Sequence, residues 1–141
     1  MSNRADLQTS TKKQLTIYSD FTRNLDCNKM SGQLAKLINE AELKDTIGNL
    51  ILIDQFEIPY SPLVGSQIQK LLFEPCDSIT ATTINTLITE TLQNNISDRI
   101  NVISVEVTAL PNEQQFKVTI TFTPKNSAKN LVFQTILQRV R

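Results

Sequence analysis

The sequence predicts the α+β class, as a small single domain with a two- to three-stranded antiparallel C-terminal sheet packed on two or three helices. Its 141 residues are typical of one domain, which buries roughly two-thirds of its unfolded surface. Between Ile84 and Leu92, apolar residues recur at spacings of three and four, which is the period of a helix. From residue 105 to residue 122 they alternate with polar residues, which is the period of a strand.

The N-terminal part predicts an arm, two short strands and a helix. Residues 1–14 are mostly polar and are expected to form a flexible arm. Apolar residues near 15–20 and 33–38 favour two short strands. Residues 40–53 carry apolar groups at helical spacing, which predicts an amphipathic helix.

The start and the middle of this first helix have specific signals. Asn39 offers an N-cap, and Glu42 stands three residues later, in the capping-box position. Gly48 lies inside the helix, where glycine costs about 1 kcal/mol relative to alanine. A close contact at that point would explain the glycine.

The centre of the chain is a loop with two prolines, followed by a short helix. Pro59 and Pro62 exclude a helix from residues 54–65. Residues 67–73 then predict a short helix that packs back on the first one, and Pro75 ends it.

A longer helix and a hairpin follow the central loop. Asp77 or Ser78 is expected to cap the longer helix, which ends near 94–95. Alternating runs at 105–109 and 116–122 predict an antiparallel hairpin with one face on the helices. Within the central loop and the short helix, Tyr60 and Phe73 are expected to fill the core, and a platform for a ligand is the alternative that we weigh against this.

The last segment, residues 131–140, fits two interpretations. Alternate residues suit a strand, and residues four apart suit a helix equally well. The strand interpretation depends on Leu131, Phe133, Thr135 and Leu137, and the helix interpretation on Val132, Ile136 and Val140.

Composition excludes several classes of function. Fourteen basic and fourteen acidic residues give no net charge, so no bulk attraction to nucleic acid or to an anionic membrane is expected. The charges are nevertheless segregated, because residues 40–77 are mainly acidic and residues 124–141 are basic. The longest apolar run, Leu50–Ile53, is far shorter than the ~20 residues of a membrane span.

Catalytic and metal-binding side chains are scarce. The chain has no histidine, which excludes histidine-based catalysis and the commonest zinc ligand. Cys27 and Cys76 are too few for a disulfide framework and are expected to be free thiols. We therefore expect no cofactor and no metal site.

Two carboxylates are the best candidates for glycoside hydrolysis, which needs a pair of acids about 5–9.5 Å apart in a cleft. Glu57 and Glu74 both lie beside apolar residues of the central region. Each also has a structural interpretation, because Glu57 can accept backbone amides and fix the 59–62 turn, and Glu74 can do the same near Pro75. Since the chain also lacks tryptophan for stacking sugars, we favour the structural interpretation.

The central motif resembles a known family. Over residues 46–75, an apolar helix end leads into Glu-x-Pro-aromatic-x-Pro-x-x-Gly and then Leu-Leu-Phe-Glu-Pro. This order resembles the baseplate wedge proteins of contractile phage tails, the GPW or gene-product-25 family, which is related to baseplate proteins of type VI secretion. The motif residues are Glu57, Pro59, Pro62, Gly65, Phe73, Glu74 and Pro75.

The resemblance implies a structural protein of the virion, not an enzyme, assembled in the host cytoplasm. It implies an arm at 1–14, a wedge domain at 15–123 and a C-terminal strand at 124–141 that starts the sheath. Its partners would be other baseplate wedge proteins, the tail sheath protein, and tail tube or hub proteins, with no nucleic acid and no membrane. The sheath-binding strand would comprise Leu131, Val132, Phe133, Gln134, Thr135, Ile136 and Leu137. A chain lacking residues 126–141 is expected to fold and to join the wedge without supporting a sheath.

A second contact is implied just before the hairpin. Where the family has Glu-Pro-Arg, a motif that clamps the bundle of the other wedge proteins, this chain has Ser97, Asp98 and Arg99. Asp98 and Arg99 are the wedge-binding candidates, and an intrachain pair of Arg99 with Asp98 or Glu106 is the alternative.

Two other functions remain open. One is a lysozyme-like enzyme that degrades peptidoglycan. The other is the equivalent baseplate part of a type VI secretion system or of another tail-like particle.

Overall fold

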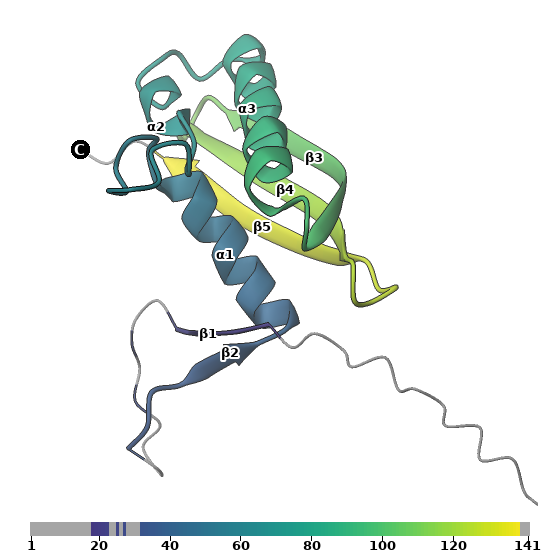
Figure 1. Ribbon diagram of the computed structural model, residues 1–141. Helices are drawn as coiled ribbons and strands as arrows, with labels where there is room; N and C mark the ends of the chain where they lie inside the picture. Colours follow the sequence, from purple (N-terminus) through teal and green to yellow (C-terminus); the bar gives the residue numbers. More distant parts are fainter. Residues whose placement is uncertain (1–17, 23–24, 26, 28–31, 139–141) are drawn as a thin grey trace, which may run out of the picture.

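The computed structural model describes residues 18–22, 25, 27 and 32–138. The arm expected at 1–14, and the end of the predicted C-terminal strand at 139–141, lie outside these residues. Figure 1 shows the arrangement of the helices and strands. In chain order they are β1 (Ser19–Phe21), β2 (Lys36–Ile38), α1 (Glu40–Leu52), α2 (Ile68–Leu71), α3 (Ser78–Ile96), β3 (Ile100–Leu110), β4 (Gln115–Pro124) and β5 (Leu131–Gln138).

The C-terminal half forms a three-stranded antiparallel sheet in the order β3-β4-β5. The hairpin of β3 and β4 turns between the two predicted alternating runs, and the ladder runs from Ile100 opposite Pro124 to Leu110 opposite Gln115. The last segment is a strand and not a helix, and it forms an edge of the sheet. The predicted α+β domain with a C-terminal sheet on three helices is confirmed.

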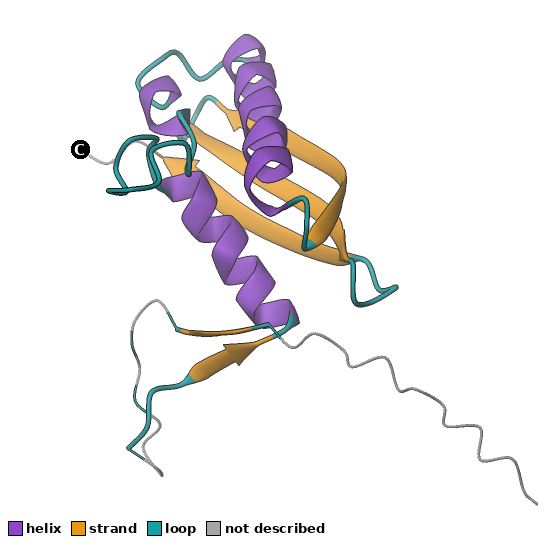
Figure 2. Cartoon of the chain, in the orientation of Figure 1, coloured by secondary structure: helices purple, strands orange, loops and turns teal. Residues whose placement is uncertain are grey.

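All three helices lie on one face of this sheet, so the domain has two layers (Figure 2). In β4, every second side chain from Phe116 to Phe122 is buried against the helices. The opposite face has Thr119 and Thr121 at its centre, both half-buried. The alternation of apolar and polar residues along β4 therefore decides which face of the sheet packs against the helices.

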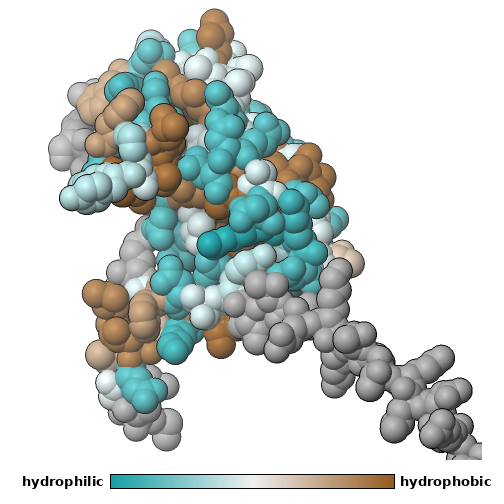
Figure 3. All heavy atoms as spheres, in the orientation of Figure 1, coloured by the Kyte–Doolittle hydropathy of each residue, from teal (hydrophilic) through white to brown (hydrophobic). Residues whose placement is uncertain are grey.

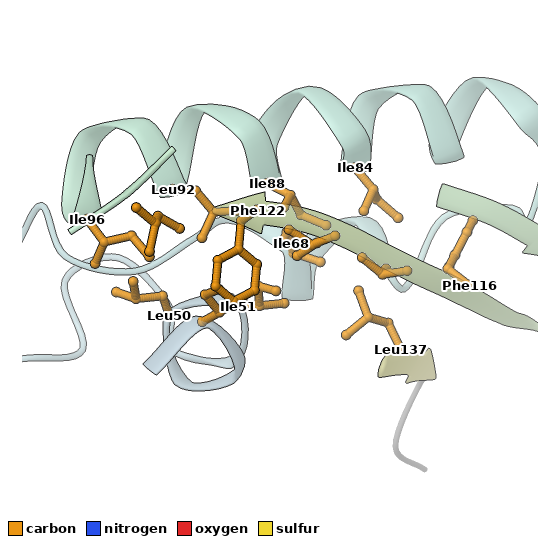
Figure 4. Close-up of a cluster of buried hydrophobic side chains, with 14 of the residues drawn as sticks. Leu50, Ile51, Ile68, Ile84, Ile88, Leu92, Ile96, Phe116, Phe122 and Leu137 are labelled. Carbon is orange, nitrogen blue, oxygen red and sulfur yellow. The ribbon is translucent and has the colours of Figure 1, made fainter. Parts of the chain in front are cut away.

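The core lies between α1, α2, α3 and the sheet. In Figure 4 the ring of Phe122 projects from β4 into the space between α1 and α3. Ile68 of α2 closes one side of this space and is 1% exposed. The buried side chains around them include Ile51, Ile84, Ile88, Leu92 and Leu137.

The helix α3 begins as the sequence predicts. Asp77 is its N-cap, and its Oδ1 accepts the backbone N–H of Thr80 at 2.8 Å. Hydrogen bonds from Thr80 stabilise the carboxylate and hold the pKa of Asp77 below its ordinary value of 3.8. Neither α3 nor any other described helix is long and apolar enough to span a membrane.

The predicted capping box of α1 is wrong. Asn39 has a positive φ of 51° and makes no side-chain cap hydrogen bond. Its backbone N–H instead donates to the carbonyl of Tyr18 at 2.7 Å, which continues the small antiparallel sheet of β1 and β2. Glu42 turns inward and is 4% exposed, so it cannot reach back to the N-cap.

Candidate interaction surfaces

The edge strand β5 pairs with β4 on one side over eight residues. No other described strand pairs with its far side. Alternate N–H and C=O groups of an edge strand point away from the sheet, so they can template a strand of another chain. The whole segment expected to bind a sheath strand, Leu131 to Leu137, lies on this edge.

The two faces of β5 differ in chemistry. Leu131 and Leu137 face the helices and belong to the core, being 5% and 3% exposed. Val132 and Ile136 lie on the opposite face and are about half exposed. The strand is thus held by its inward side chains while its outer backbone edge stays available.

A groove of about 650 Å³ separates β5 from α1. Small residues of α1, Ala41 and Gly48, line it on one side, and Phe133 and Thr135 of β5 line it on the other. The glycine within α1 is buried and lines this groove. Both small residues leave room beside the edge of β5 for an extended segment.

Arg99 precedes β3 and packs within its own chain. Its Nη1 lies 3.3 Å from Oε1 of Glu42, and its guanidinium lies 5.4 Å from the ring centre of Tyr18. Arg99 therefore does form an intrachain pair, but its acid is Glu42 and neither Asp98 nor Glu106. The Arg99 side chain remains 40% exposed, so part of its guanidinium faces solvent.

Glu42 is incompletely satisfied. Its Oε1 accepts hydrogen bonds from Thr46 at 3.0 Å and from Arg99, whereas its buried Oε2 has no hydrogen-bond partner among the described residues. A buried, ionised carboxylate destabilises the folded protein strongly when the positive charge beside it is removed. Arg99 therefore joins the start of α1 to the start of β3.

The central loop, residues 54–65, is a closed structure. Ser66 donates its N–H to the carbonyl of Ile53 at 2.8 Å, which joins the two ends of the loop. Phe56 donates to the carbonyl of Pro62 at 2.9 Å, which closes the tip. Gly65 has a φ of +112°, and a Cβ there would lie 2.6 Å from the carbonyl oxygen of Ile53.

Two aromatic residues of the motif region are not in the core, contrary to expectation. Tyr60 is fully exposed, with a relative accessibility of 104%, and Phe73 is 64% exposed. Phe56, also exposed, shares with Tyr60 a left-handed backbone, with φ of 71° and 70°. That conformation costs about 1–2 kcal/mol for a residue with a side chain. The spacing of apolar residues carries no information about positive φ, so the sequence did not indicate that these side chains are exposed to solvent.

The two carboxylates of the enzymatic hypothesis have different environments. Glu57 accepts the backbone N–H of Asp54 at 3.0 Å, at the start of the loop and not at the 59–62 turn that it was expected to fix. The exposed Glu74 side chain accepts no hydrogen bond from the described residues, so the structural role predicted for it is wrong. Glu74 lines a pocket beside Cys76, and Glu57 is not among the residues of that pocket.

Within the described part of the chain, no group of three or more His, Cys, Asp or Glu side chains could hold a metal ion. Cys27 and Cys76 are free, as expected.

Comparison with known proteins shows the fold. No protein-family model matches the chain, and no curated protein matches it either. A solved structure that matches is the crystal structure of a "putative tail lysozyme" from Geobacter sulfurreducens, with a TM-score of 0.58 and 22% identity. The match covers 76% of this chain and 100% of that chain. The two proteins therefore share the same α+β fold over the whole of the smaller one.

Proposed function

We propose that this chain is a structural component of a contractile-tail baseplate wedge, and that it starts sheath assembly through β5. The observation that carries the proposal is an edge strand whose outer side pairs with no described strand, next to a groove whose lining includes the small residues Ala41 and Gly48. An extended segment of the first sheath ring would add to β5 as a further strand. The tail origin implied by the neighbour's description and the resemblance of the central motif support the same assignment.

The groove suits such a segment in shape and in chemistry. Backbone groups of β5 would supply hydrogen bonds, and Phe133 would be covered by apolar side chains of the incoming strand. Lys125 and Lys129 stand just before β5 and would attract an acidic segment. Lys129 lies 3.7 Å from Glu40 at an exposed site, a pair that is worth little on its own.

In this proposal Asp98 and Arg99 form a second contact, with the other wedge proteins. Asp98 is exposed, and the exposed part of Arg99 can donate to carboxylates or to carbonyls at a helix end. Glu42 and Tyr18 hold the guanidinium in one orientation, which lowers the entropy lost on binding.

The test is seeding of the sheath protein from the same particle, measured by sedimentation and electron microscopy. Thr135→Lys places a charge in the groove, an established means of preventing strand addition, and should reduce seeding at least tenfold. Val132→Lys is the matched control, because it adds the same charge to the opposite face of β5. The proposal fails if the wild-type chain does not seed the sheath, or if both variants seed it as efficiently as the wild type.

The same mechanism applies to a type VI secretion system or to another tail-like particle, and the sheath protein that responds identifies the particle. For the enzymatic alternative, a turbidity assay on peptidoglycan is decisive. We expect no clearing by the wild type or by the Glu57→Gln and Glu74→Gln variants. Clearing that these two substitutions abolish would replace our proposal with a lysozyme.

A further inference from the structure

The central loop is an apolar knob on the surface of the protein. Three of its side chains, Phe56, Tyr60 and Leu63, are 74%, 104% and 76% exposed. The hydrogen bond from Phe56 to the carbonyl of Pro62 places the first and last of these close together. In Figure 3, brown and tan surface is interspersed with pale teal at the upper left, where Figure 1 draws this loop next to α2. Exposed apolar groups gathered in one place mark an interaction site more often than scattered ones do.

The backbone holds these side chains outward at a cost. Phe56 and Tyr60 both have the left-handed φ that glycine adopts without strain. Hydrogen bonds made by Glu57, Ser61 and Ser66 close the loop and hold this strained backbone in place. Strain held in this way is typical of segments that bind partners.

Next to the knob lies a polar pocket of about 230 Å³ between the central loop and α3. Leu63 belongs to both the knob and the pocket. The residues that line the pocket include the acidic Glu90 and residues with amide side chains, such as Asn94, and no basic residue is among them. It can therefore receive a guanidinium or an ammonium group.

We propose that the knob and this pocket together dock a protein with a concave apolar surface that carries a lysine or an arginine at its rim. The knob would fill the concavity, and the cation would reach Glu90. The exposed charge of the loop agrees with a basic partner, because residues 54–65 include the exposed Glu57 and no basic residue. An acidic border repels nucleic acid and anionic lipid, so a basic protein surface is the fitting partner. This proposal rests on the proposed function, since the partner would be another protein of the baseplate.

The experiment is photocrosslinking from position 60 in assembled particles. Tyr60→p-benzoylphenylalanine keeps an aromatic side chain at the tip of the knob, and mass spectrometry identifies what it joins. We expect a crosslink to an apolar segment of one baseplate protein, next to a lysine or an arginine. The same probe at Ile79, which is exposed on α3, should give no such product. A chain present in particles but joined at position 60 to nothing, or to a second copy of itself, overturns the docking proposal. A chain absent from all particles overturns the proposed function instead.

Two substitutions give an independent measurement. Tyr60→Gly removes the side chain at a backbone where glycine is unstrained, so Tm should stay the same or rise. Incorporation into particles should nevertheless fall at least tenfold. Glu90→Lys reverses the charge of the pocket and should also lower incorporation about tenfold, whereas Glu113→Lys on the β3–β4 turn should not. Normal incorporation of both Tyr60→Gly and Glu90→Lys would contradict the proposal.

Discussion

Removal of β5 should unfold the protein, and the expected size of the effect follows from two buried leucines. Leu131 and Leu137 are at most 5% exposed and belong to the core. Full burial of a leucine contributes about 1.5–3 kcal/mol, so the pair contributes about 3–6 kcal/mol. The total stability of a domain is about 5–15 kcal/mol. A chain without residues 126–141 should therefore be partly or wholly unfolded at 25 °C, which replaces the sequence-based expectation of a folded, sheath-deficient protein.

The assay is urea denaturation followed by circular dichroism, with the extrapolated free energy of unfolding as the measured quantity. Leu137→Ala alone should lower that free energy by about 2–5 kcal/mol, because it leaves a cavity between β5 and the helices. Ile136→Ser, at an exposed position on the same strand, should change it by no more than about 0.5 kcal/mol. A truncated chain with the unfolding midpoint of the full chain would refute the reasoning, because β5 would then contribute nothing to the core.

The remaining predictions concern three local features. Arg99→Met should lower the free energy of unfolding by about 1–3 kcal/mol, because it leaves the buried Glu42 without its cation. In a double-mutant cycle, the variant that carries both Arg99→Met and Glu42→Met should lose less free energy of unfolding than the sum of the losses in the two single variants. Gly65→Ala should cost about 1–3 kcal/mol in the same assay, since its Cβ would meet a backbone oxygen 2.6 Å away. Asp77 stabilises the folded state above pH 3.8, where its carboxylate is charged, and the contribution is lost as pH falls through its lower folded-state pKa. Thermal melts should therefore show a greater loss of Tm between pH 5 and about pH 3 for the wild type than for Asp77→Asn, which caps without titrating at that pH.

Local patterns in the sequence predict most of the elements. The apolar stripe of α3, its Asp77 cap and the alternation of β4 depend on neighbours within a few residues. The short helix predicted at 67–73 packs against the rest of the domain, and Ile68 of α2 is buried. These features follow from the spacing of apolar residues and from the capping residues of helices, and both can be identified in a single sequence.

The errors come from contacts between distant parts of the chain. Asn39 does not cap α1 through its side chain, because its backbone pairs with Tyr18, 21 positions earlier. Arg99 pairs with Glu42 across 57 positions, a distance over which a single sequence offers no signal. Tyr60 was expected to fill the core, yet it has a left-handed backbone conformation and is fully exposed to solvent.

The two roles of β5 are compatible because they use different parts of the strand. Inward side chains at both ends, Leu131 and Leu137, fix the strand to the helices, while the backbone groups on its outer side have no described strand to bond. Between these anchors, Phe133 and Thr135 are only half-buried and face a groove beside the small residues of α1. A neighbouring strand laid there would extend the sheet and complete the burial of Phe133 without displacing either leucine. The core can therefore stay closed while the edge binds, and for this reason point substitutions in the groove, and not truncations, separate folding from sheath assembly.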